Sequence, residues 1–154
     1  MKSLCKKDGA LEIVFEPNEA EFLVGLSGKI AQALESPGNK RLFPSFSKDP
    51  KVDNELREML HADLKAGRLE RLAVFQRELQ TARRPDSAFV LDDAAAERWL
   101  GVLNDLRLIM ADELGIDADD WPTRLSKEQR AAPAVRTYLY LTGLQGHLLE
   151  ELMA

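Results

Sequence analysis

The segment from Arg98 to Leu108 constrains the fold of this chain more than any other stretch. Apolar residues recur there at the spacing of one broad helical face, which predicts a helix central to the core: Trp99, Val102, Leu103, Leu106, Ile109 and Met110. Asn104, Asp105 and Arg107 interrupt this segment, and buried polar groups need hydrogen-bond partners. We therefore expect a structural polar cluster that ties neighbouring helices together. A partner-binding role is the alternative if Asn104 or Arg107 faces a groove.

Length and composition place the chain among single globular domains. It has 154 residues, of which 45% are hydrophobic and 31% charged. The net charge of -5 provides no overall positive field for nucleic acid. No stretch approaches the roughly 20 apolar residues that a membrane span needs. The lysines near the N-terminus precede no apolar run of a signal peptide. We therefore expect a cytoplasmic protein that is not bound to a membrane.

Hydrophobic periodicity and capping residues predict a mainly α fold, a bundle of about five helices at residues 18–35, 53–64, 69–79, 93–114 and 133–152. Ala66-Gly67 is expected to break or bend the helical pattern between the second and third segments. Leu11–Glu16 and Ala88–Leu91 are rich in strand formers and could pair as a short two-stranded ribbon. Residues 1–10 are predicted to be a flexible tail, and residues 11–154 to form a single helical domain.

The usual catalytic patterns are absent from the sequence. It contains no glycine-rich phosphate loop, no Gly-x-Ser-x-Gly and no Cys-x-x-Cys. His61 and His147 fall on different predicted helices, which disfavours a metal site. Cys5 is the single cysteine, so it has no partner for an intramolecular disulfide and is only a weak redox candidate. We therefore expect a protein that is not an enzyme, with no catalytic residues, no metal and no cofactor.

Two surface features are candidates for binding a partner. Arginines around the expected break at Ala66-Gly67 suggest a helix-turn-helix that contacts nucleic acid: Arg68, Arg71, Arg77, Arg83 and Arg84. Glu70 and Glu78 interleave with them, so an ordinary solvated surface is favoured and DNA binding is the alternative. Trp121, in an acidic loop, either folds back onto the core or anchors a partner.

The last predicted helix has a wide apolar face. Its main stripe is widened beyond one face by Leu139, Tyr140 and Leu149. A face of this width is typical of a central helix or of a helix with a second, intermolecular surface. We therefore predict a homo-oligomer, such as a homodimer through this helix.

Several short motifs resemble an actinobacterial family of AosR-type oxidative-stress regulators, long catalogued as a domain of unknown function. They are Arg41–Pro44, Ala62–Leu69, Trp99-Leu100, Leu103–Leu108, Leu114–Ile116, Tyr138-Leu139 and Leu144-Gln145. The resemblance implies a cytosolic regulator that acts in the oxidative-stress response together with an alternative sigma factor. It also implies a redox-active pair of cysteines spaced Cys-x-x-x-Cys. This sequence lacks that pair, so Cys5 could act only through an intermolecular or mixed disulfide.

Overall fold

The computed structural model describes residues 1, 3–35, 42–43, 45–83, 88–116 and 125–154. The fold is mainly α, as predicted. Its elements are β1 (Ser3–Lys7), β2 (Ala10–Val14), α1 (Glu19–Ala33), α2 (Pro50–Ala82), β3 (Phe89–Leu91), α3 (Asp93–Leu114), α4 (Lys127–Ala131) and α5 (Pro133–Met153).

The strands form a small antiparallel sheet in the order β1-β2-β3. Pairing of Leu11 with Leu91 confirms the predicted ribbon. The prediction of a flexible tail at residues 1–10 is corrected, because β1 pairs with β2 along its whole length and Leu4 is buried. Asp8-Gly9, a strong hairpin signal in the sequence, forms the turn with φ of 52° and 82°.

The second and third predicted helices are one continuous helix, α2. The expected break at Ala66-Gly67 does not occur, so the structure contains no helix-turn-helix at this place. A glycine inside a helix costs only about 1 kcal/mol relative to alanine, which strong helix formers and tertiary contacts on either side can offset. The N-terminus of α2 is fixed by Asp49, whose side chain accepts a hydrogen bond of 3.0 Å from the backbone N–H of Lys51.

Two other helices show the effect of their capping residues. Asp92 caps α3 by accepting a 2.8 Å hydrogen bond from the backbone N–H of Ala95, and Gly115 ends it with φ of 69°. Both ends agree with the predicted helix. The short α4 is not among the five predicted helices, and a capping box between Ser126 and Gln129 explains its formation.

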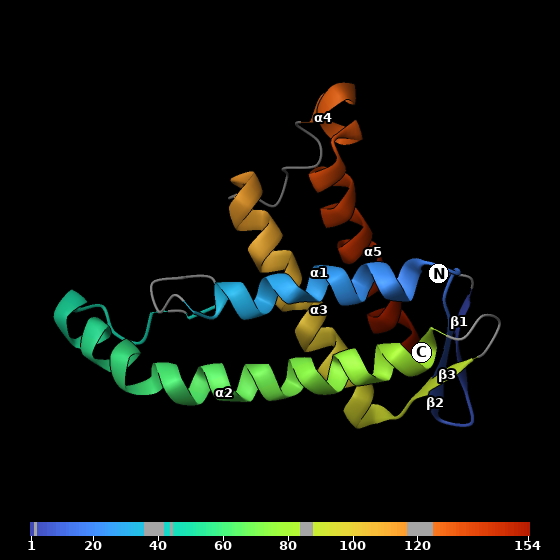
Figure 1. Cartoon of the computed structure of the whole chain (residues 1–154), viewed down its shortest axis with the longest axis horizontal. Helices are drawn as coiled ribbons and strands as arrows, with labels where there is room; N and C mark the ends of the chain where they lie inside the picture. Colours follow the sequence, from blue (N-terminus) through green and yellow to red (C-terminus); the bar gives the residue numbers. More distant parts are fainter. Residues whose placement is uncertain (2, 36–41, 44, 84–87, 117–124) are drawn as a thin grey trace.

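The helices cross around α3, which packs against α1, α2, α5 and β3. Figure 1 shows α1 and α2 side by side, α3 crossing both, α5 along α3, and the sheet at one end. Trp99 is fully buried, and its ring centroid lies 5.0 Å from that of Phe75 on α2 and 5.7 Å from that of Phe89 on β3. The predicted central helix is therefore central in the structure.

Candidate functional site

Asp105 joins α3 to α2. Its carboxylate is almost completely buried and accepts hydrogen bonds from two arginines of α2, Arg68 and Arg71, at donor–acceptor distances of 2.5 Å. The side chains of Arg68 and Arg71 are partly exposed, at 24% and 32%. A buried carboxylate is therefore neutralised by cations that reach in from the surface.

Gly101 allows the side chain of Arg71 to pass close to α3. A methyl group on Gly101 would lie 2.8 Å from Arg71 Cζ, closer than real side chains approach. Gly101 precedes Asp105 by one helical turn, so the two residues lie on the same face of α3. The lack of a side chain at Gly101 thus opens the path by which Arg71 reaches Asp105.

We predict an energetic coupling between Gly101 and Arg71. In an Arg71→Ala background, Gly101→Ala should stabilise the protein by about 1 kcal/mol, because alanine favours the helix. In the native background that gain should be offset by displacement of the guanidinium group. Urea denaturation of the four proteins should give a coupling energy of at least about 1 kcal/mol. Additive effects within about 0.3 kcal/mol would contradict this reading.

Arg107 forms a separate set of contacts with α5. Its Nε donates to Thr142 Oγ1 at 3.1 Å, and its Nη1 donates to Gln145 Oε1. The guanidinium carbon lies 5.7 Å from the ring centroid of Tyr138. The predicted cluster of Asn104, Asp105 and Arg107 is therefore two sets of contacts, one to α2 and one to α5. Asn104 is half-buried and belongs to neither set within the described part of the chain.

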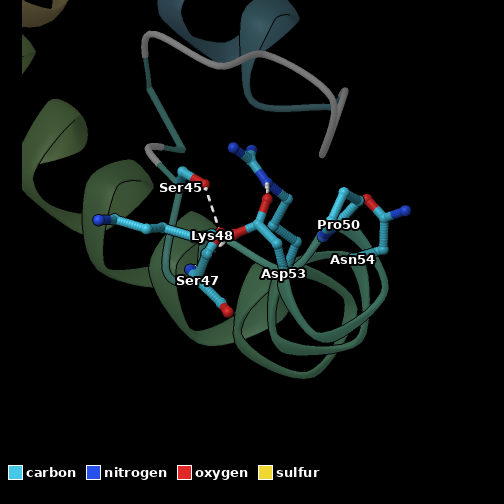
Figure 2. A pocket seen from close by; sticks show the side chains of 7 residues that line it. Ser45, Ser47, Lys48, Pro50, Asp53 and Asn54 are labelled. Carbon is cyan, nitrogen blue, oxygen red and sulfur yellow. Dashed lines mark hydrogen bonds and ion pairs between the residues drawn. The ribbon is translucent and has the colours of Figure 1, made fainter.

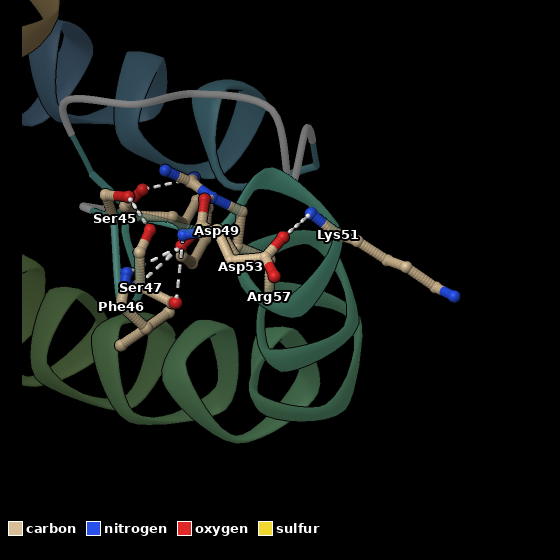
Figure 3. A network of polar contacts seen from close by, with 8 residues as sticks. Ser45, Phe46, Ser47, Asp49, Lys51, Asp53 and Arg57 are labelled. Atoms are coloured by element: carbon tan, nitrogen blue, oxygen red, sulfur yellow. Dashed lines mark hydrogen bonds and ion pairs between the residues drawn. The ribbon is translucent and has the colours of Figure 1, made fainter.

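A third polar network fixes the loop before α2, and the sequence analysis did not identify it. Asp53 accepts hydrogen bonds from the backbone N–H groups of Phe46 at 2.6 Å and Ser47 at 3.2 Å, and from Arg57 Nε at 2.9 Å (Figure 3). Arg57 also donates to the carbonyl oxygen of Phe43. The i,i+4 spacing of Asp53 and Arg57 was the available sequence signal for the ion pair, while the loop contacts required the fold.

A hollow of about 290 Å³ lies beside this network, lined by Ser45, Ser47, Lys48, Pro50, Asp53, Asn54 and Arg57. Figure 2 shows the Lys48 side chain extending away from Asp53. Asp53 and Arg57 bind each other, so their charges are satisfied within the protein. The arrangement accounts for an ordered loop and offers no converging set of free catalytic groups among the described residues that line it.

The network makes the effect of Asp53 on stability dependent on pH. The Arg57 hydrogen bond, followed by the Phe46 N–H, lowers the pKa of Asp53 from 3.8 to about 2. A lowered pKa stabilises the folded state above the unfolded value, and this contribution disappears as the pH falls from about 3.8 to about 2. We predict that Asp53→Asn destabilises the protein at pH 6 and that its effect shrinks across this interval. Urea denaturation at pH 6, 4 and 2 tests this, and a pH-independent effect would contradict it.

The arginines of the predicted surface lie in different contacts. Arg68 and Arg71 bind Asp105, and their side chains remain partly exposed. Arg77 is exposed. Arg83 is exposed, donates to Gln80 at 2.9 Å and lies 3.9 Å from the carboxylate of Glu21. Arg84 lies outside the described residues.

The remaining candidate residues are dispersed. Cys5 is exposed on β1. Trp121 lies outside the described residues. His61 on α2 contacts the ring of Phe43, and His147 is exposed on α5. Within the described ranges, no group of three or more His, Cys, Asp or Glu residues is placed to hold a metal ion. Of the helices described, none is both long and apolar enough to cross a membrane.

Comparison with known proteins identifies the family of this chain. A relative from Mycobacterium leprae (strain TN), described as a candidate oxidative stress regulator AosR, is 28% identical over 148 residues. The match covers 89% of this chain and 68% of the relative. No solved structure matches the chain. The family model for a domain of unknown function, DUF2017, matches residues 1–152. The chain therefore belongs to the DUF2017 family.

Proposed function

We propose that this protein is a non-enzymatic, cytoplasmic regulator of the oxidative-stress response that acts through a protein partner of the transcription machinery, such as a sigma factor. The observation that carries the proposal is the similarity, over most of the chain, to a relative described as a candidate oxidative stress regulator. The sequence motifs that resemble AosR-type regulators point in the same direction.

The polar contacts support a role in binding rather than in catalysis. Asp53, Asp105 and Arg107 are each engaged with other parts of the fold, where they hold helices and a loop in place. Large apolar side chains are instead exposed, including Met59 on α2 and Met153 on α5. Where exposed apolar side chains form a contiguous face on a helix, that face is typical of a protein-binding surface.

The proposal is tested in cells of the source organism. Deletion of the gene should alter the transcriptional response to peroxide, and the native gene should restore it. A tagged copy should enrich a sigma factor or an RNA polymerase subunit from stressed or unstressed cells. An unchanged peroxide response in the deletion strain, with neither protein enriched, would refute the proposed function.

The role of Cys5 is tested separately in the same strain. Any disulfide through Cys5 must form with a thiol of another molecule, because the chain has one cysteine. Complementation with Cys5→Ser therefore distinguishes thiol-dependent regulation from regulation that only requires the folded surface. Non-reducing electrophoresis after peroxide treatment would detect the mixed or intermolecular disulfide.

We also propose that α5 mediates a homodimer. Its outward face carries Leu139, Leu149 and Met153 at 37%, 42% and 84% exposure, together with the exposed Gly143 and the half-buried Gly146. Leu139 and Met153 lie equally far from Gly146 along the helix, and so do Gly143 and Leu149. An antiparallel pair centred on Gly146 would therefore pack Leu149 against Gly143 of the second copy, and Leu139 against Met153.

This arrangement predicts a concentration-dependent dimer. Leu149→Glu should raise the dissociation constant at least about tenfold, because it places a charge in an apolar contact. Ala66→Glu on the exposed face of α2 is the matched control and should have no effect. Light scattering over a range of protein concentrations measures the mass, and a native mass of one chain at the highest concentration would contradict the prediction.

A further inference from the structure

The first half of α2 exposes an apolar stripe. Val52, Leu56 and Met59 are spaced by four and three residues and therefore share one face of the helix. Val52 and Met59 are 41% and 73% exposed, and Leu56 is half-buried. Figure 1 shows this half of α2 extending past the C-terminal end of α1, with its first turns inclined to the rest of the helix. The stripe thus lies on a projecting part of the protein.

Acidic side chains border this stripe. Glu55 and Glu58 lie along one side of it and Asp63 continues it, and all three are exposed. None of the three forms an ion pair with another described residue, whereas Asp53 on the same helix is bound to Arg57. Among the exposed basic residues of α2, Lys51 is the nearest to Met59 along the chain, and it lies in the first turn of the helix. The surroundings of Met59 therefore combine apolar surface with net negative charge.

The charges decide which kind of partner fits. An antiparallel pair of α2 helices centred on Met59 would place Glu55 of one copy opposite Asp63 of the second. A parallel pair would place each acid opposite itself. Like charges held directly opposite each other are unfavourable, so the acidic border disfavours a second copy of this chain. Lysine or arginine residues flanking an apolar stripe would instead complement it.

We propose that the stripe formed by Val52, Leu56 and Met59, with its border of Glu55, Glu58 and Asp63, is the docking surface for a basic amphipathic helix of a protein partner. The partner helix packs apolar residues at i, i+3, i+4 and i+7 against Met59 and places lysines or arginines beside the acids. This inference rests on the proposed function, because it assigns the surface through which the regulator contacts its partner.

Synthetic peptides test the surface directly. One helical peptide carries leucines at i, i+3, i+4 and i+7 spacing with lysines elsewhere, and its twin carries glutamates in place of the lysines. Calorimetry with the full chain should show binding of the basic peptide that weakens with added salt, and much weaker binding of the acidic twin. Met59→Glu should weaken binding of the basic peptide at least about tenfold.

The chain offers matched controls for both parts of the surface. Val90→Glu changes another exposed apolar residue, on β3 and outside both proposed surfaces, and should leave peptide binding unchanged. Reversal of Glu55, Glu58 and Asp63 to lysine should abolish binding of the basic peptide. Replacement of three other exposed glutamates by lysine, at Glu97, Glu128 and Glu150, should preserve binding of the basic peptide. Circular dichroism should show native helix content in every variant, because all the altered side chains are exposed.

Each other outcome overturns the inference. Equal binding of the two peptides, equal loss in the control variants, or conversion of a dimer to a monomer by Met59→Glu would contradict a basic partner at this surface. In cells, a full peroxide response with the Glu55, Glu58 and Asp63 reversals refutes the docking surface while the proposed function stands. A deletion strain with an unchanged response refutes the proposed function itself.

Discussion

Replacing Asp105 with alanine should destabilise the protein by about 3 kcal/mol, because it leaves the guanidinium groups of Arg68 and Arg71 without their buried counter-charge. We place the effect at the low end of the range for broken buried ion pairs. The two arginines are partly exposed and can turn toward solvent, which recovers part of the loss. Urea or guanidinium denaturation at neutral pH measures the change.

Two further variants separate the charge of Asp105 from its shape. Asp105→Asn keeps the volume and can still accept hydrogen bonds, so its cost should be smaller than that of alanine. Replacing Asp105, Arg68 and Arg71 together by leucine and two methionines removes all three charges and should recover much of the lost stability. If the triple variant is no more stable than Asp105→Ala, the destabilisation does not come from uncompensated charge.

Replacing Trp99 with alanine should cost about 4 kcal/mol, the largest effect that we expect from a single substitution in this chain. The side chain is fully buried and lies against three aromatic rings that come from different parts of the fold. Phe75 lies on α2, Phe89 on β3 and Phe15 directly after β2, with its ring centroid 6.0 Å from that of Trp99. Truncation leaves a cavity at the junction of the sheet and the helices.

A phenylalanine at this position distinguishes packing from hydrogen bonding. The buried Nε1 of Trp99 has no hydrogen-bond partner within the described residues. Trp99→Phe therefore removes an unsatisfied donor and keeps most of the ring contacts, so it should cost less than about 2 kcal/mol. Thermal denaturation followed by circular dichroism compares the variants. Equal losses for phenylalanine and alanine would contradict an indole nitrogen without a hydrogen-bond partner.

Local signals in the sequence were sufficient for much of the fold. Asp92 and Gly115 identify the ends of α3, because capping depends on residues within one turn. Strand-forming runs identified β2 and β3 and their pairing. Where competing local signals were close in strength, the prediction failed. The sequence predicts a break or bend at Ala66-Gly67, but α2 continues through it, and it predicts a flexible tail that includes Leu4, which is buried in β1.

The sequence by itself determined that Asp105 and Arg107 must have partners, because they interrupt the apolar face of a central helix. Only the tertiary structure decided which partners these are. Arg68 and Arg71 precede Asp105 by 37 and 34 residues, and Thr142 follows Arg107 by 35. Contacts at such separations depend on where helices cross, and no local periodicity encodes a crossing point. Because α2 and α3 cross at this point, Arg68 and Arg71 are the counter-ions of the buried Asp105 carboxylate.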